Sequence, residues 1–234
     1  MHTLIPGKVT ARVFTGFSPF AFYQAGQIVG FDIDIVAGFA QAHGLELALS
    51  PTSVFEDIWH SPGDGTADLA AAGIARFTER LRDDVAWSTP YYEVLRSILI
   101  NESQLGTLAT IADFEGRSIA FVRGSTADLD TRARAPNSAH LLPVENQAEG
   151  VAMLQAGAID GLAMGAPSNS FNRSIDPRFA LIDVHAFSQP EGLRFPVAKR
   201  NQALLEALNH FIRTAKASGD IARYIDKWDM QNAG

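Results

Sequence analysis

The sequence predicts an α/β fold in which helices pack on mainly parallel strands. Short apolar segments typical of buried strands alternate along the chain with amphipathic segments typical of helices, and this alternation is the pattern of parallel βαβ units. The 234 residues are 47% hydrophobic and 19% charged, a composition that supplies enough apolar material for a sizeable core. The length fits one large domain or two smaller lobes.

The first half of the chain begins with a predicted strand and a long predicted helix. Residues 9–14 alternate between apolar and polar side chains, as a half-buried strand does. Residues 30–43 carry apolar side chains at helical spacing, and Gly44 fits the end of that helix. The other elements predicted here are strands at 45–50 and 67–73, a short helix at 54–60, and extended segments at 85–90 and 97–100.

The second half repeats the alternation and ends in two helices. A buried strand is predicted at 116–122, followed by a turn into a helix at 123–130. Residues 201–217 have the apolar periodicity of a strong amphipathic helix. The remaining predicted elements are a helix at 148–157, strands at 159–164 and 192–198, and a closing helix at 221–228.

Residues 72–80 are the stretch that most strongly suggests a binding site. The buried strand at 67–73 precedes Thr78, a good N-cap for a charged helix at 79–84. Unpaired backbone N–H groups at such a helix start can hold a carboxylate or phosphate, and Arg80 can add a two-pronged ion pair. The alternative is that Arg80 and Arg82 are solvated charges in a first helical turn.

A second turn of the same type follows the strand at 116–122. Ser125 or Thr126 can cap the helix that begins there. The same hydroxyl and the first N–H groups of the helix can also face an anion. The alternative is a plain N-cap without a ligand.

Composition and motif searches exclude several classes of function. The net charge of −7 and the lack of a basic stripe with interleaved aromatic residues predict no nucleic-acid partner. The chain has no cysteine, the six histidines lack metal-ligand spacing, and no phosphate-loop or nucleophile-elbow motif occurs. We therefore predict no catalytic residue, no metal and no cofactor. No apolar run is long enough to span a membrane, and residues 1–8 lack the apolar region of a secretory leader.

The order of the motifs resembles the extracytoplasmic solute-binding protein family 3, which serves polar amino acid ABC transporters. The matching stretches are 17–20, 30–34, 55–57, 68, 73–80, 88–92, 114–116, 124–126, 157–160, 218–222 and 227–228. The resemblance implies a periplasmic-binding-protein type II fold with ligand in a cleft between two lobes. It places lobe 1 at 1–94 and 190–234 and lobe 2 at 95–189, with crossing segments near 93–96 and 187–192.

The resemblance also assigns binding roles. Arg80 matches the arginine that holds the ligand's carboxylate, and Thr126, helped by Ser125, matches the lobe 2 donors to that group. The carbonyl of Gly73 and the N–H of Ala75 match the backbone that lines the site. Phe17 and Phe55 match aromatic residues that sandwich the ligand, although ordinary core packing is the alternative for these two.

The sequence departs from the family pattern where the ligand's ammonium is received. Gly165 takes the position of the expected acid, and residues 164–170 contain no acid at all. A buried ammonium without a counter-charge is costly, so an amine-free carboxylate or dicarboxylate is one expected ligand. The other is an amino acid whose ammonium finds Glu56 or Glu145. Ala75 and Phe77 also replace an expected hydroxyl residue and threonine, and Arg76 is either a second cationic contact or a surface residue.

The function implied by the resemblance is ligand binding for transport. A monomer would close its lobes on a small carboxylate and dock on a membrane permease, in the periplasm or another extracytoplasmic space, its leader being absent from this chain. One alternative is an enzyme resembling cyclohexadienyl dehydratase, which needs a partly desolvated acid such as Glu56 or Glu145. Another is the ligand-binding sensor domain of a receptor.

Overall fold

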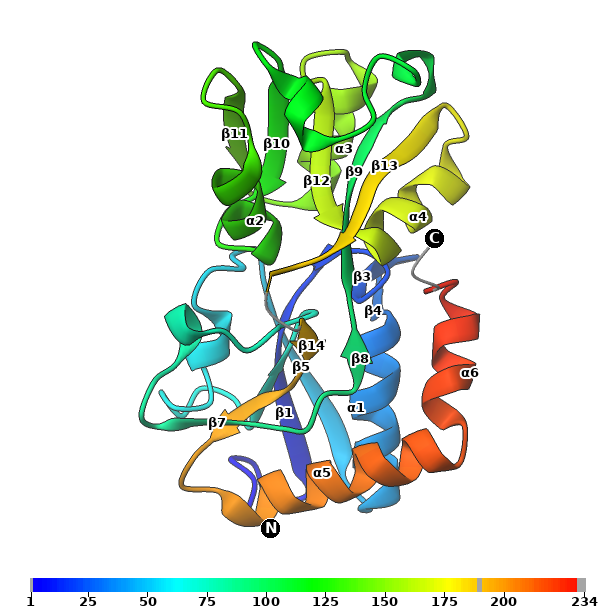
Figure 1. Cartoon of the computed structure of the whole chain (residues 1–234). Coiled ribbons are helices and arrows are strands. Elements are labelled where there is room, and N and C mark those ends of the chain that lie inside the picture. Colours follow the sequence, from blue (N-terminus) through cyan, green and yellow to red (C-terminus); the bar gives the residue numbers. More distant parts are fainter. Residues whose placement is uncertain (1, 189–190, 231–234) are drawn as a thin grey trace. The chain divides into compact units, whose positions relative to one another are not determined.

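The computed structural model describes residues 2–188 and 191–230, which divide into two units (Figure 1). Unit 1 contains Met1–Glu93 and Gly192–Trp228, and unit 2 contains Val94–Glu191 with Asp229 and Met230. The chain passes between the units after Glu93 and returns after Glu191. The second expected crossing, near 187–192, includes residues 189 and 190, which lie outside the described part of the chain.

A five-stranded sheet forms the centre of unit 1. Its strands, in spatial order, are β5 (Glu46–Thr52), β1 (Lys8–Phe14), β6 (Leu69–Ala71), β15 (Pro196–Ala198) and β7 (Val85–Trp87). Strand β1 pairs in parallel with β5 and β6, whereas β15 pairs antiparallel with β6 and β7. Val9, Ala11 and Val13 of β1 are all buried because alternate residues of a strand face the same side.

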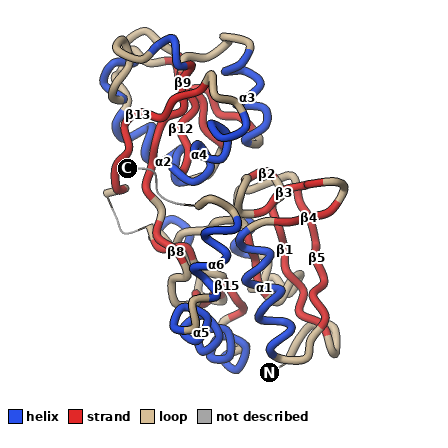
Figure 2. Tube along the Cα trace, turned by 90° about the vertical axis from the view of Figure 1, so that its right-hand side faces the viewer, coloured by secondary structure: helices blue, strands red, loops and turns tan. Residues whose placement is uncertain are grey.

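Smaller sheets and three helices complete unit 1 (Figure 2). Strands β2 (Gly16–Phe17), β3 (Ala21–Gln24) and β4 (Gln27–Val29) form one small sheet, and β8 (Tyr92–Glu93) pairs with β14 (Gly192–Leu193). The helices are α1 (Phe31–Ala42), α5 (Gln202–Ala217) and α6 (Asp220–Lys227). Single 3₁₀ turns occupy Ile58–His60 and Thr78–Arg80.

Side-chain contacts explain the two C-terminal helices. Asn201 caps α5 by accepting a hydrogen bond from the N–H of Leu204, and the buried residues of α5 recur at helical spacing. Asp34 in the first turn of α1 accepts from Lys227 Nζ at 2.7 Å and from Trp228 Nε1 at 2.7 Å. These contacts fix the end of α6 against α1.

Unit 2 contains a second five-stranded sheet. Its order is β11 (His140–Val144), β10 (Ser118–Val122), β12 (Gly161–Gly165), β9 (Leu95–Asn101) and β13 (Phe179–Ala186). Strand β10 pairs in parallel with β11 and β12, and β9 runs antiparallel to both β12 and β13. The other elements are α2 (Thr126–Arg134), α3 (Gln147–Gln155), α4 (Ala166–Ile175), and 3₁₀ turns at Glu102–Gln104 and Ile111–Phe114.

The predicted α/β class is confirmed, and each sheet is mixed: four strands run in one direction, and one strand, β15 in unit 1 and β9 in unit 2, runs in the opposite direction. Among the helices of the described ranges, none is both long and apolar enough to cross a membrane. The predicted strand at 192–198 forms two short strands, and the predicted helix at 54–60 is only the turn Ile58–His60.

The prediction of a helix at 79–84 is wrong. After the single turn Thr78–Arg80 the chain becomes extended at Leu81, and Thr78 makes no capping bond. Arg82 pairs with Asp84, two residues on, and with Asp64. Side chains two residues apart do not face each other on a helix, so this pairing favours the extended backbone instead.

Candidate functional site

Arg80 is a buried cation enclosed by aromatic rings in unit 1. Arg80 ends the 3₁₀ turn Thr78–Arg80, in the segment that follows β6, and the residue is only 2% exposed. The guanidinium carbon lies 4.6 Å from the centre of the Trp59 ring, 5.3 Å from Phe77 and 5.6 Å from Phe55. Nη1 donates a hydrogen bond to the carbonyl oxygen of Ala75 at 2.9 Å. Aromatic faces attract such a cation while carrying no formal charge.

The loop between β6 and Arg80 is held by a buried acid of helix α1. Asp32 is fully buried and accepts from the Gly73 N–H at 2.7 Å and from the Tyr91 hydroxyl at 2.9 Å. Burial raises the pKa of Asp32 to about 7. Gly73 has φ of 61°, and a side chain there would begin 3.1 Å from the Phe20 ring, so this position favours glycine.

Phe17 and Phe55 contact each other directly. Their ring centres are 4.8 Å apart, and Phe14 lies 4.9 Å from Phe17 and 5.5 Å from Phe55. Rings at that separation leave no room for a ligand between them, because apolar side chains have packed together. The expectation that these two rings sandwich a ligand therefore does not fit this arrangement, and contact of a ligand with their outer faces stays a prediction.

In unit 2, Ser125 and Thr126 lie where β10 meets α2. Ser125 is the N-cap of α2, since its hydroxyl oxygen accepts from the Asp128 N–H at 3.3 Å. Thr126 is the first residue of the helix and is buried. The Asp128 carboxylate accepts from the Gly124 N–H at 2.9 Å. The capping interpretation is thus confirmed for Ser125, and anion binding by this helix start remains a prediction.

Gly165 lies opposite Arg96, a residue that is not among the site residues predicted from the sequence. Gly165 ends β12, and Arg96 of β9 is its direct partner across the antiparallel ladder. A side chain at position 165 would begin 2.9 Å from Nη2 of Arg96. Arg96 Nε lies 2.9 Å from Glu191 Oε2, and these residues are 7% and 5% exposed. The available signal was a single charge within the apolar strand 95–100.

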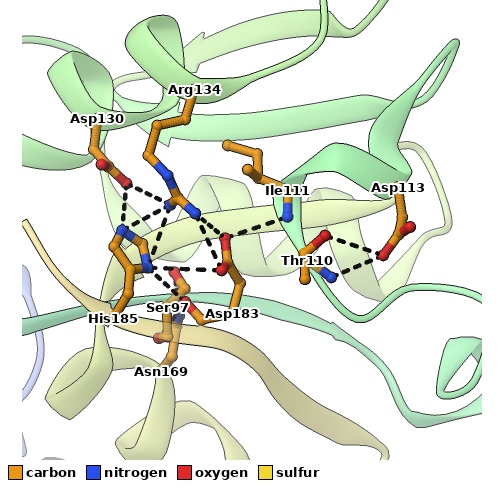
Figure 3. A network of polar contacts seen from close by, with 9 residues as sticks. All are labelled: Ser97, Thr110, Ile111, Asp113, Asp130, Arg134, Asn169, Asp183 and His185. Atoms are coloured by element: carbon orange, nitrogen blue, oxygen red, sulfur yellow. Dashed lines mark hydrogen bonds and ion pairs between the residues drawn. The ribbon is translucent and has the colours of Figure 1, made fainter.

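A polar network includes residues of β13, the strand that pairs with β9 (Figure 3). His185 of β13 pairs in register with Arg96, and its Nε2 lies 3.1 Å from Asp130 and 2.7 Å from Arg134 Nη1. Arg134 also donates to Asp183 at 2.8 Å. The contact with Asp130 raises the pKa of His185 above its usual value. This network ties helix α2 to the end of β13.

The other acids considered from the sequence are exposed. Glu56 is exposed, and Glu145 is exposed, with its carboxylate 3.4 Å from Arg123. Neither has the partial desolvation that a dehydratase acid needs. Arg76 is also exposed. In the described ranges, no group of three or more histidine and acidic residues could hold a metal ion.

The comparisons with known proteins agree with this architecture. A model of the bacterial extracellular solute-binding proteins, family 3, matches residues 10–231. The ABC transporter arginine-binding protein 1 of Escherichia coli K12 is 25% identical over 229 residues, covering 96% of this chain and 91% of that protein. A solved amino acid ABC transporter substrate-binding protein from Streptococcus pneumoniae, bound to L-arginine, has a TM-score of 0.86 at 26% identity over 94% of both chains.

An ancestral amino acid-binding protein, described as a precursor of cyclohexadienyl dehydratase, has a TM-score of 0.86 at 23% identity over 95% of both chains. At that identity the likeness concerns the fold alone. These likenesses confirm the periplasmic-binding-protein type II fold class. The family match covers nearly the whole chain, and the protein therefore belongs to the bacterial extracellular solute-binding proteins, family 3.

Proposed function

We propose that this protein captures a small carboxylate outside the cytoplasmic membrane, as a monomer, and delivers it to an ABC permease. The observation that carries the proposal is the buried Arg80 guanidinium, which the segment following the carboxyl end of β6 contributes. In α/β sheets, ligands bind beyond the carboxyl ends of the strands. The guanidinium contacts three aromatic rings and donates to the carbonyl oxygen of Ala75. A guanidinium stays protonated and presents its donors in a planar fork that matches a carboxylate, so a carboxylate is the ligand group that suits this residue.

The comparisons support the choice of a carboxylate. The E. coli relative is named for arginine binding, and the S. pneumoniae protein was solved with L-arginine. Every amino acid carries a carboxylate, and we propose that the ligand of this protein shares that group. We do not propose an α-ammonium on the ligand, because Gly165 supplies no acid to receive one.

We propose that binding joins the two halves of the molecule. Arg80, Gly73 and Ala75 would contact the ligand from unit 1, while Ser125 and Thr126 would donate to the same carboxylate from unit 2. A ligand that contacts both units stabilises the state in which both contacts exist, so it shifts the population toward a closed form. That form would be the one recognised by the permease.

The test begins with a thermal-shift screen of amino acids, 2-oxo acids and dicarboxylates, because a ligand at one hundred times its Kd stabilises the folded state by about 2.7 kcal/mol. Arg80→Gln is then titrated calorimetrically with the best ligand. We expect affinity to fall about a hundredfold, or ~3 kcal/mol, because a charge-assisted pair is lost.

Arg178→Gln is the matched control, since Arg178 is an exposed arginine that pairs with Asp176, two residues before it. Circular dichroism verifies that each variant is folded, and Arg80→Lys tests whether charge alone suffices. Unchanged affinity in Arg80→Gln would refute the assignment. Turnover of prephenate or arogenate by the wild-type protein would refute the transport proposal in favour of an enzyme.

A further inference from the structure

We infer that Arg96 is a second anion-binding residue of this protein and that the ligand carries a second carboxylate where an amino acid carries its ammonium. The inference deepens the proposed function and rests on it, because it assumes that the ligand binds at the carboxyl edge of the unit 2 sheet. It names the ligand class as dicarboxylates without an amine.

The strand register brings Arg96 to that edge. Strands β10 and β12 are parallel neighbours, so the residues that follow them lie at one edge of the sheet. Ser125 and Thr126 follow β10, and Gly165 is the last residue of β12. Strand β9 is antiparallel to β12 and starts where β12 ends, which places Arg96 directly beside Gly165. The cation and the α2 helix start therefore belong to the same edge.

Glycine at position 165 makes room for this cation. A Cβ atom there would lie 2.9 Å from Arg96 Nη2 and 3.1 Å from Val94 Cγ1, both closer than ordinary van der Waals contact. Any larger residue would force the guanidinium to move. The group nearest residue 165 is consequently the Nη2 donor of Arg96, while the Glu191 carboxylate lies on the Nε side of the same guanidinium. A carboxylate placed beside residue 165 can accept from Nη2, whereas an ammonium has only donors to offer.

The hydrogen-bond donors of Arg96 lie along the edges of its planar guanidinium. A guanidinium has five N–H donors in one plane. Arg96 Nε lies 2.9 Å from Glu191 Oε2, but the two are not aligned for a hydrogen bond. Nε is therefore a buried donor without a hydrogen-bond acceptor among the described residues, and such a donor is costly. The other edge of the guanidinium, formed by Nη1 and Nη2, matches a planar acceptor with two oxygens.

Glu191 acts as a positioning residue for Arg96. Both side chains are more than nine-tenths buried, and a buried ion pair contributes little net stability compared with apolar residues of the same size. Its effect is to hold the guanidinium at the start of β9. A ligand ammonium that paired with the Glu191 carboxylate would also lie close to the positive guanidinium of Arg96. Ligands with and without an ammonium are therefore compared.

The test compares probes that differ by one group. Calorimetry with succinate, glutarate and adipate is compared with butyrate, which has one carboxylate, and with L-glutamate and L-arginine, which add an ammonium. We expect at least one dicarboxylate to bind about tenfold to a hundredfold more tightly than butyrate, the range expected for charge-assisted hydrogen bonds. L-Glutamate or L-arginine binding more tightly than every dicarboxylate would overturn the inference, as would equal affinity for the dicarboxylates and butyrate.

Variants then assign the effect to Arg96. Arg96→Gln should reduce dicarboxylate affinity to the level of butyrate while leaving butyrate unchanged, and Arg178→Gln should change neither. Arg96→Gln removes one half of a buried ion pair, which destabilises the fold, so the neutral pair Arg96→Gln/Glu191→Gln is measured as well. Gly165→Asp should weaken dicarboxylate binding and strengthen amino acid binding. Dicarboxylate preference that survives in the folded double variant would overturn the inference.

The two proposals fail in different ways. Loss of all binding in Arg80→Gln together with an unchanged ligand preference in Arg96→Gln would refute only the role of Arg96. Unchanged binding in Arg80→Gln would refute the proposed carboxylate site itself. Failure of the Arg80 carboxylate site is detected from the total affinity. Failure of the role of Arg96 is detected from the ratio of dicarboxylate to monocarboxylate affinity.

Discussion

Replacing Asp32 by asparagine should remove most of the pH dependence of stability between about pH 4 and pH 7. Asp32 is fully buried and holds the Gly73 N–H and the Tyr91 hydroxyl. Asparagine has nearly the same shape. Its carbonyl oxygen can accept from Gly73, and its amide can donate to the Tyr91 oxygen. The variant therefore keeps both contacts and loses only the ionisable group.

The magnitude follows from the pKa of the buried carboxyl. Burial raises this pKa from 3.8 to about 7. Between those values the folded protein holds a proton that the unfolded chain releases, so the free energy of unfolding falls as pH rises. Each pKa unit corresponds to about 1.4 kcal/mol, and the whole window therefore costs the wild type roughly 4 kcal/mol. Above pH 7 the carboxylate is ionised in both states and the loss is complete.

The assay is urea unfolding of the wild type and Asp32→Asn at pH 4, 5, 6, 7 and 8. We expect similar stability at pH 4, where the carboxyl is largely protonated in the folded state and only beginning to ionise in the unfolded chain, and a more stable variant at pH 8. Asp226→Asn serves as the control, since Asp226 is exposed on α6. Parallel curves for wild type and Asp32→Asn across the window would refute the reasoning, because they would mean that Asp32 does not change its proton affinity on folding.

Two further predictions concern contacts outside the proposed site. Asp34→Ala removes the acceptor for Lys227 and Trp228 and should lower the free energy of unfolding by about 1–2 kcal/mol; an unchanged urea midpoint would contradict this. His185→Gln should destabilise the protein more at pH 6 than at pH 9. The contact with Asp130 raises the pKa of His185, so its stabilising effect is complete below the unfolded pKa and is lost as pH rises through the folded value. Equal loss of melting temperature at both pH values would contradict it.

The elements with strong apolar periodicity could be predicted from the sequence. The helix expected at 201–217 is Gln202–Ala217, because its apolar stripe packs on the rest of unit 1. The strand expected at 9–14 is Lys8–Phe14, since its alternation matches a sheet with one buried face. In both cases the local pattern and the tertiary burial agree.

Helix α4 was not predicted, and its composition explains why. Its buried face is polar: Ser168, Asn169 and Asn172 are all buried. Asn169 donates to the backbone and hydroxyl oxygens of Ser97, and Gln147 donates to Asn172. A helix whose interior contacts are hydrogen bonds has no apolar stripe, so hydrophobic periodicity cannot reveal it.

The candidate site could be predicted only where the signal was local. The cap formed by Ser125 was visible because the cap and the helix are adjacent in sequence. Arg80 could be singled out, but Asp32 of helix α1 and the enclosing Trp59 and Phe77 rings could not be grouped with it. The guanidinium and the Trp59 ring are 21 positions apart in sequence and 4.6 Å apart in space. That proximity depends on how the loops after β5 and β6 pack.

Arg96 was missed for a reason that applies to mixed sheets generally. A search of strand carboxyl ends finds the residues after β10 and β12, because parallel strands all end at one edge. An antiparallel neighbour contributes its amino end to that edge. Arg96 lies near the start of β9 and directly opposite Gly165. If β9 is assumed to be parallel to its neighbours, its carboxyl end is searched for site residues, and Arg96 at its amino end is overlooked. Position 165 lacks an acid and lies directly beside the guanidinium of Arg96, and both features have the same origin in the register of β9 and β12. The inferred second carboxylate of the ligand is consistent with both.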